Sequence, residues 1–132
     1  MAGDVDLRIF KTKVFARFAN KERISDAALC DAVDRAESGL IAADLGGCII
    51  KQRIGKKGQG KSSGYRVLIA VRVKKRYVFL FGFAKNEKDN ISDDELDVLK
   101  KYGSTWLNAD EIVIESALKM DKLIEVKYAK KT

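Results

Sequence analysis

Cationic side chains are the groups in this sequence that could do chemistry, and they gather in one stretch of the chain. Between Leu45 and Asn86 there are eleven lysines and arginines and no acidic residue, whereas the whole chain carries 26 basic and 19 acidic residues. Like charges repel one another unless an anion neutralises them, and the phosphates of a nucleic acid supply that anion. This stretch therefore indicates a nucleic-acid-binding surface, with a solvated basic face as the alternative.

A glycine-rich segment lies in the middle of this stretch, where glycines alternate with cations from Gly55 to Arg66. It is not a nucleotide-binding P-loop, because its Gly-Lys-Ser triplet at 60–62 leads into a predicted strand, whereas that motif opens a helix. We expect a flexible, exposed loop whose Lys56, Lys57 and Lys61 lie along a phosphate backbone. A surface loop without a ligand is the alternative interpretation.

Three predicted strands position the remaining cations. Residue alternation and β-branched or aromatic content predict strands at Cys48–Ile54, Tyr65–Val73 and Tyr77–Ala84, with a tight turn before the last strand. Lys51 and Arg53 lie two residues apart, and successive side chains of a strand point to opposite faces. Both cations should therefore lie side by side on one face.

An aromatic run marks the last of these strands. Tyr77, Phe79, Phe81 and Phe83 alternate along it, which predicts that they pack in the core. Base stacking by Tyr77 or Phe83 is the alternative. The residues that we expect to be buried in the sheet are Ile50, Val67, Ile69, Phe79 and Phe81.

Helical patterns precede and follow these strands. A short edge strand at Val5–Phe10 leads into a helical hairpin, whose second helix Ser25 or Asp26 can cap. Ser92 begins a capping box for a third helix. Asp110–Met120 predicts a fourth helix, and the basic tail Asp121–Thr132 should fray. Together these elements predict an α+β fold.

Length and composition limit the class of protein. A chain of 132 residues is long enough to fold as one domain, and no apolar segment approaches the length of a membrane span. The start does not resemble a secretory signal, so we expect a cytoplasmic protein. Cys30 and Cys48 lie in apolar patterns without the paired spacing of a metal site. We interpret both as reduced core residues and expect neither a metal nor a cofactor.

Three short motifs resemble those of the RelE and HigB type of toxin from bacterial type II toxin-antitoxin pairs. They are Gly-Gly-Cys-Ile-Ile-Lys-Gln-Arg-Ile at 46–54, Ser-Gly-Tyr-Arg at 63–66 and Phe-Ala-Lys-Asn-Glu at 83–87. The resemblance spans roughly Leu7 to Val126. It implies a microbial ribonuclease-like α+β fold, an antiparallel sheet with helices packed on one face. It also implies mRNA cleavage in the ribosomal A site and a cognate antitoxin, usually a helix-turn-helix protein of the XRE type.

The same resemblance implies roles for single residues. Lys51 and Arg53 fall where the family carries basic strand residues, Arg66 matches its phosphate-contacting arginine, and Lys85 matches the cation that closes the last strand. The chain departs from the family in having no histidine, which excludes a histidine acid-base pair. A lysine crowded by other cations is then the candidate proton acceptor, Lys51 first and Lys85 second.

The two arginines would hold the scissile phosphate, a task suited to a planar fork of donors, and Tyr65 could assist as an RNA-binding helper. Two other functions stay open. One is a non-catalytic RNA- or ribosome-binding module, and the other is a toxin directed at another target, such as DNA gyrase. Only a ribonuclease would leave new mRNA 5′ ends within codons.

Overall fold

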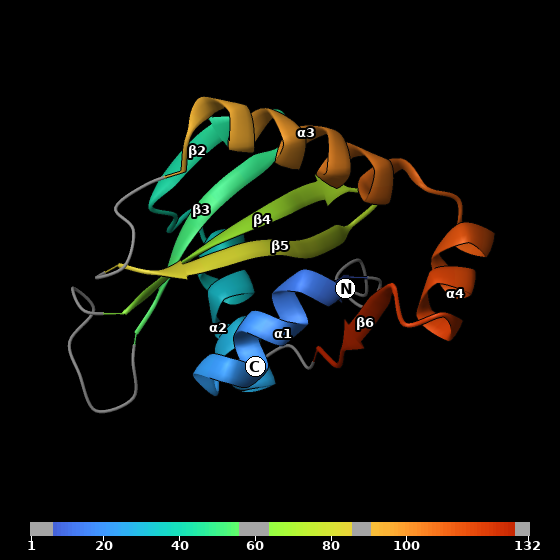
Figure 1. Ribbon diagram of the computed structural model, residues 1–132, viewed down its shortest axis with the longest axis horizontal. Coiled ribbons are helices and arrows are strands. Elements are labelled where there is room, and N and C mark those ends of the chain that lie inside the picture. The colour runs from blue at the N-terminus through green and yellow to red at the C-terminus, as the bar shows by residue number, and fades with distance from the viewer. Residues whose placement is uncertain (1–6, 56–63, 86–90, 129–132) are drawn as a thin grey trace.

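The computed structural model describes residues 7–55, 64–85 and 91–128. The elements along the chain are β1 (Arg8–Thr12), α1 (Lys13–Glu22), α2 (Asp26–Glu37), β2 (Ala43–Gly46), β3 (Ile49–Ile54), β4 (Tyr65–Val73), β5 (Arg76–Ala84), α3 (Asp93–Asn108), α4 (Glu111–Lys119) and β6 (Leu123–Val126). Figure 1 shows their arrangement. The predicted helices are all present. Ser25 caps α2, and the capping box at Ser92 is formed.

One sheet joins all six described strands in the order β2-β3-β4-β5-β1-β6. Strands β3 to β5 pair antiparallel, as predicted, and β2, which was not predicted, pairs antiparallel with β3. Strand β1 runs parallel to β5 and antiparallel to β6. The α+β fold is therefore confirmed. Two details were wrong: the N-terminal strand is interior rather than an edge, and Leu123–Val126 is the edge strand rather than part of a fraying tail.

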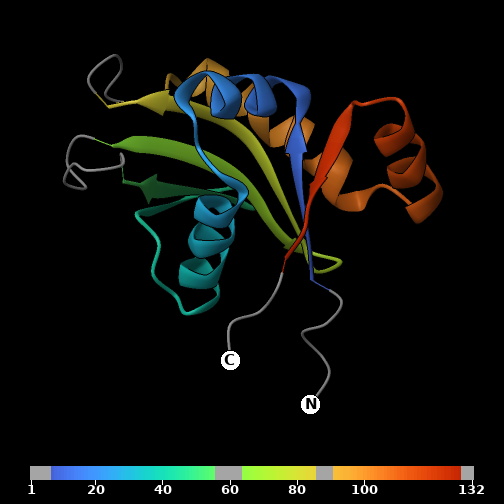
Figure 2. The ribbon, with the colours of Figure 1, turned by 90° about the horizontal axis from the view of Figure 1, so that it is seen from below.

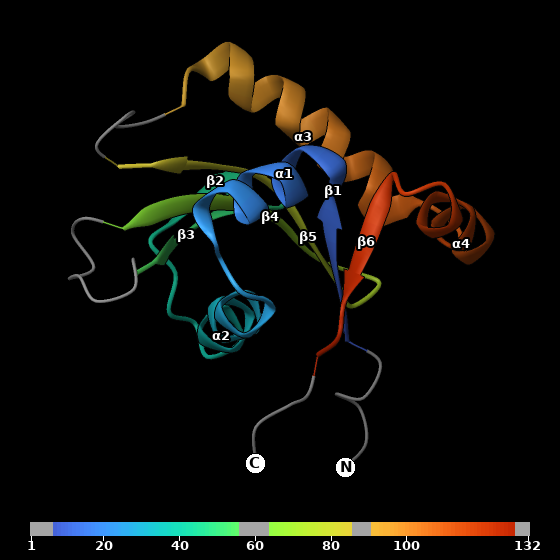
Figure 3. The same cartoon turned by 60° about the horizontal axis from the view of Figure 1, so that its bottom comes forward.

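Helices cover both faces of this sheet, so the expectation that they pack on one face was also wrong. Helices α1 and α2 lie over a core that contains Ile50, Val67 and Tyr77. Helix α3 packs on the other face, and α4 completes that second core beside β6. Figures 2 and 3 show α2 and α3 on opposite sides of the sheet. The reason lies in β4, which is apolar and buried on both faces from Val67 to Val71.

A β-bulge in β5 redirects the aromatic run. The register with β4 shifts between Leu68 and Ile69, and a bulge of this kind sends the following side chains to the other face. Tyr77 and Phe79 lie in the α1/α2 core, while Phe81 packs against the α3 core. The prediction that the aromatics share one face was therefore wrong. Of the residues expected to be buried, Ile50, Val67, Ile69 and Phe79 are, and Phe81 is only partly so.

Two turns require left-handed backbone. Lys74 and Lys75 both have φ near +57°, the conformation of a two-residue hairpin turn that matches strand twist. Between β2 and β3, Gly46, Gly47 and Cys48 all have positive φ. This turn places Cys48 at the surface, so its prediction as a core residue was wrong, and both cysteines are reduced.

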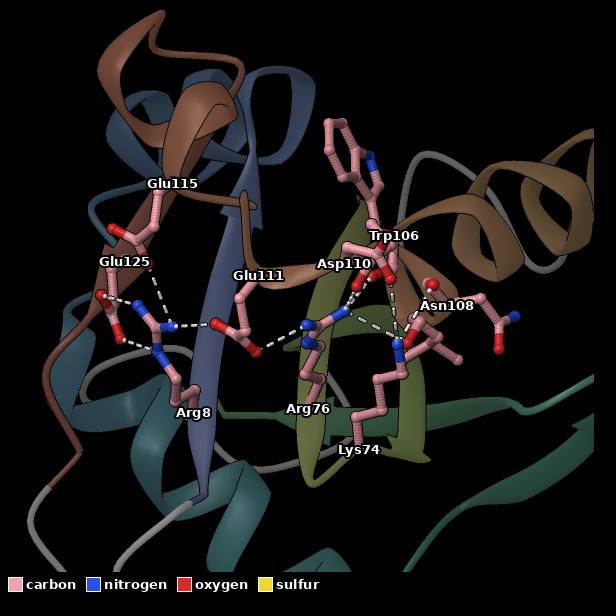
Figure 4. A network of polar contacts seen from close by, with 11 residues as sticks. Arg8, Lys74, Arg76, Trp106, Asn108, Asp110, Glu111, Glu115 and Glu125 are labelled. Carbon is pink, nitrogen blue, oxygen red and sulfur yellow. Dashed lines mark hydrogen bonds and ion pairs between the residues drawn. The ribbon is translucent and has the colours of Figure 1, made fainter. Parts of the chain in front are cut away.

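A buried arginine ties the sheet to the junction of α3 and α4. Arg76, at the start of β5, is 1% exposed. Its Nη1 donates to the carbonyl oxygens of Trp106, Leu107 and Ala109 at 3.0, 3.3 and 2.6 Å, and its Nη2 donates to Glu111 Oε2 at 2.8 Å (Figure 4). The last carbonyls of a helix have no partner within the helix. Arg76 therefore satisfies the C-terminal end of α3 and holds the first turn of α4.

A second arginine completes this polar network from the neighbouring strand. Arg8 of β1 donates from Nε and Nη2 to both oxygens of Glu125 at 2.8 Å, and from Nη1 to Glu111 at 3.1 Å and Glu115 at 3.3 Å. Glu111 thus bridges two arginines from adjacent strands (Figure 4). The network fixes α4 against the β5-β1-β6 part of the sheet.

Replacing Arg76 tests this tie. Arg76→Met should lower the free energy of unfolding by about 3 kcal/mol. The substitution leaves the buried carbonyl groups at the end of α3 without a hydrogen-bond donor, and it leaves Glu111 without its closest cation. Chemical denaturation followed by circular dichroism measures the change. Lys74→Met is the matched control: Lys74 donates to the same helix end at 3.3 Å but is exposed, so its loss should change stability by less than about 0.5 kcal/mol. Equal losses in both variants would contradict the tie.

The same network predicts how acid affects stability. The hydrogen bond from Arg76 lowers the pKa of the Glu111 carboxyl below its ordinary value of 4.5, and the charges of Arg8 and Lys74 add to this while burial opposes it. A carboxyl whose pKa is lowered on folding stabilises the fold above the unfolded value and loses that contribution as pH falls through the folded value. The stability difference between wild type and Glu111→Gln should therefore be full at about pH 7 and shrink below 4.5.

The control for this experiment is Glu111→Gln made in the Arg76→Met background. Without Arg76, most of the pH dependence of the stability difference caused by Glu111→Gln should vanish. Denaturation at a series of pH values, in wild type and the three variants, gives all four curves. A stability difference that stays constant with pH would show that Glu111 acts only by packing.

Candidate functional site

The predicted cations of β3 and β4 meet on the α3 face of the sheet. Arg53 pairs directly with Arg66, and Lys51 pairs with Leu68. On the far side of β4, Arg66 pairs with Phe83 and Leu68 with Phe81. These residues form two rows of three across the strands, and we call Lys51, Arg53, Arg66, Leu68, Phe81 and Phe83 the cationic face. Directly paired residues have Cβ atoms about 4.5–5.5 Å apart.

The two arginines of the cationic face make an unfavourable pair as they stand. Arg66 is 8% exposed and Arg53 is exposed. Burial lowers the pKa of Arg66, and the charge of Arg53 lowers it further. No acidic residue that the structure describes forms an ion pair with either arginine or with Lys51. Like charges placed opposite each other across a strand pair are destabilising, so this arrangement favours a bound anion.

The middle turns of α3 do not pack over the end of the sheet that carries Arg53 and Arg66. Gly103 of α3 lies against Ile49, Ala70 and Leu80, one row away from Lys51 and Leu68. A Cβ at Gly103 would come within 3.0 Å of the Ala70 side chain, so glycine permits this close contact. The ends of β3, β4 and β5 extend past the start of α3 (Figure 1). The row of Arg53, Arg66 and Phe83 belongs to these ends.

The other predicted site residues are placed differently. Lys85 follows β5, is exposed, and donates its backbone N–H to the Gly64 carbonyl at 3.1 Å, so it continues the alternation that places Phe83 on the cationic face. Tyr65 lies on the opposite face, 3% exposed, with its hydroxyl donating to Glu22 at 3.0 Å. It is therefore not brought together with the cations. Lys56, Lys57 and Lys61 lie outside the described residues.

Two residues that hold the cationic strand were missed by the sequence analysis. Gln52 lies between Lys51 and Arg53 but points to the opposite face, where it is 2% exposed. Its Nε2 donates to the carbonyl oxygens of Ala32 at 3.1 Å and Leu40 at 2.9 Å. A polar residue at a core-facing position of a strand was the signal that could have revealed it, because buried polar groups need partners.

Arg35 of α2 hydrogen-bonds to β3 on the side of that strand that faces β2. Strand β2 pairs with β3 only as far as Lys51, which leaves the next carbonyl groups of β3 without a strand neighbour. The Arg35 Nη2 donates to the Arg53 carbonyl at 2.7 Å, and its Nε donates to Asp31 at 3.0 Å. Helix α2 therefore fixes β3 at the backbone of Arg53.

The bulge gives the cationic face an aromatic side. Phe81 and Phe83 have ring centroids 6.2 Å apart, and they flank Arg66 and Leu68 along β5. Arginine guanidinium groups bind phosphates through paired donors, and aromatic rings stack on bases. Each row thus combines at least one cation for a backbone phosphate with one aromatic ring, an arrangement suited to single-stranded RNA. Phe81 is half-buried, whereas Phe83 is 6% exposed, so a base would stack on Phe81.

Two negative findings concern the described part of the chain. Within residues 7–55, 64–85 and 91–128, no three acidic or cysteine side chains cluster as a metal site would require. None of the helices described there has the length and apolar character needed to cross a membrane.

In a comparison with protein-family models, residues 7–126 match the model described as the RelE toxin of the RelE / RelB toxin-antitoxin system. This match covers β1 to β6 and therefore the whole described sheet. No curated protein sequence matches the chain.

The hydrogen bonds of Gln52 generate a prediction for this site. Gln52→Leu keeps the strand apolar but leaves the Leu40 carbonyl without its donor, so the free energy of unfolding should fall by about 1–3 kcal/mol. Urea denaturation measures it. Asn20→Leu, an exposed polar-to-apolar change on α1, is the control and should change stability by less than about 0.5 kcal/mol. A Gln52→Leu variant as stable as the wild type would show that these bonds do not hold β3.

Proposed function

We propose, on the premise that this chain belongs to the RelE toxin family, that it is a ribosome-dependent endoribonuclease that cuts mRNA and so inhibits translation. The observation that supports this proposal is the cationic face, in which Arg53 and Arg66 are paired across two strands beside Lys51. Such a cluster fits a phosphate that is about to gain charge in a transition state.

The chemistry we propose uses the RNA's own 2′-hydroxyl as the nucleophile. Lys51 takes the hydroxyl proton, the oxygen attacks the adjacent phosphorus, and the bond to the 5′-oxygen of the next nucleotide breaks. The leaving oxygen takes up a proton, and the products are a 2′,3′-cyclic phosphate and a 5′-hydroxyl. Arg53 and Arg66 stabilise the charge on the phosphate oxygens. Lys85, exposed at the end of β5, is the second candidate for proton transfer.

Family membership also implies a partner, because a RelE toxin is one half of a toxin-antitoxin pair. We propose that this antitoxin is a helix-turn-helix protein of the XRE type and that it covers the cationic face or blocks entry into the ribosome. The site of action, the ribosome, places the protein in the cytoplasm in this proposal. The neighbouring gene should encode the antitoxin.

Substitutions at Lys51 and Arg66 test the catalytic assignment. Lys51→Met and Arg66→Ala should each reduce cleavage of mRNA on translating ribosomes by about a hundredfold to a thousandfold, because both act on the transition state. Ribosome binding, measured by sedimentation at one fixed salt concentration, should change little. Lys101→Met is the matched control, since Lys101 is an exposed cation on α3, and it should cleave at the wild-type rate.

A second substitution at Lys51 separates proton transfer from charge. Lys51→Arg keeps the positive charge but removes the proton acceptor, because arginine stays protonated in proteins, so this variant should be as inactive as Lys51→Met. Wild-type cleavage by Lys51→Met and Arg66→Ala would refute the assignment. A wild-type protein that binds ribosomes without producing new mRNA 5′ ends would instead support the non-catalytic binding module, and growth arrest without ribosome binding would support another target such as DNA gyrase.

A further inference from the structure

The exposed side of α1 is a second cationic surface that the proposed reaction does not use. Five residues of α1 are exposed, and three of them are the cations Lys13, Arg17 and Lys21. They are spaced four residues apart, so they form a row along the helix with steps of about 6 Å. We call these three residues the α1 stripe.

The α1 stripe differs from the exposed faces of the other three described helices, each of which carries acidic residues. These are Asp26, Asp31 and Glu37 on α2, four acids in the first turns of α3, and Glu111 and Glu115 on α4. The acidic residue of α1, Glu22, is half-buried and accepts the Tyr65 hydroxyl. None of the three stripe cations forms an ion pair with a described acidic residue, whereas Lys11 just before the helix pairs with Asp26.

The N-terminal end of α1 adds a further unfavourable charge. Lys13 is the first residue of the helix, after the cap at Thr12, and the first turn contains no acidic residue. A helix N-terminus carries partial positive charge and is stabilised by anions, so a cation there is repelled. An anion bound along the stripe would relieve both this repulsion and that between the cations.

The stripe lies close to the same end of the sheet as the cationic face. Phe18 of α1 packs over Gly82 of β5 so closely that a Cβ there would lie 2.4 Å from the ring. Glu22, at the last turn, contacts Tyr65, the neighbour of Arg66 on β4. Helix α1 therefore runs toward the strand ends that carry Arg53 and Arg66, on the other side of the sheet (Figures 1 and 3).

We propose that the α1 stripe binds the phosphate backbone of double-helical RNA while the cationic face holds the strand to be cut. This proposal rests on the proposed function. The exposed face of α1 has no aromatic residue, and proteins that bind single strands use aromatic rings to stack the bases. Helical RNA is recognised through its phosphates and shape, for which a rigid row of cations is sufficient. Val14 is the single large apolar residue exposed on this helix, which disfavours a membrane surface.

The test removes three charges from the stripe and compares an equal loss elsewhere. The stripe variant is Lys13→Gln, Arg17→Gln and Lys21→Gln combined. The matched control combines Lys101→Gln, Lys119→Gln and Lys122→Gln, which are exposed and form no ion pair with a described residue. Both variants have the same net charge. Binding to a synthetic RNA hairpin and to purified ribosomes is measured over a range of salt concentrations, with cleavage assayed in parallel.

Each backbone contact contributes about 0.9 to the slope of log affinity against log salt on a duplex. The stripe variant should therefore lose about two to three units of slope on the hairpin, while the control keeps the wild-type slope. Equal slopes for wild type and stripe variant would overturn the proposal, as would equal losses in stripe variant and control. A stripe variant that binds RNA normally but fails to bind the antitoxin would also overturn it, because the stripe's partner would then be an acidic protein.

The two proposals fail in different ways. If the stripe variant keeps its RNA affinity while Lys51→Met abolishes cleavage, the ribonuclease assignment stands and the stripe does not bind RNA. If neither wild type nor variant cleaves but the stripe variant loses hairpin binding, the stripe proposal stands without the catalytic one.

Discussion

The burial of β4 on both faces is the constraint on which the rest of the structure depends. Its residues from Val67 to Val71 lie between the α1/α2 core and the α3 core. A shift of one residue would exchange the side chains that β4 supplies to the two cores, so packing on both faces specifies the register with β3 and β5. That register is also what places Arg53 opposite Arg66. The apolar half of the sheet therefore holds two like charges together that would otherwise separate.

The two ends of the sheet differ in how their arginines are paired. The end of the sheet near Arg76 is closed by polar contacts to α3 and α4, in which every arginine has a carboxylate or carbonyl partner. The opposite end presents arginines that lack an acidic partner among the described residues. The polar contacts at the first end stabilise the fold, and the second end is the one to which the proposed function assigns the RNA phosphate. Gln52 and Arg35 fix the strand that carries Lys51 and Arg53 to helix α2.

Sequence patterns predicted the four helices and the strands β1, β3, β4 and β5, because helix caps and strand alternation are local signals, but not β2 or β6. Ser25, Ser92 and the Lys74-Lys75 turn are examples. The bulge in β5 was not predictable, because the extra residue looks like any other in an apolar run and is set by pairing with β4. For the same reason the aromatic rings of β5 were assigned to one face. Tyr65 was assigned to the site although it is adjacent to Arg66 on β4, and strand alternation sends the two side chains to opposite faces. The parallel placement of β1 depends on contacts with β5 and β6 far along the chain, which periodicity does not encode.

The place of β1 in the sheet bears on how the protein is made. This strand is synthesised first, yet its neighbours are β5 and β6, and Arg8 bonds to a residue 117 positions later. The sheet of the nascent chain therefore cannot be completed until β6 has left the exit tunnel, and contacts this distant also slow folding. Under the function proposed above, this order of assembly delays any activity on ribosomes until β6 has emerged.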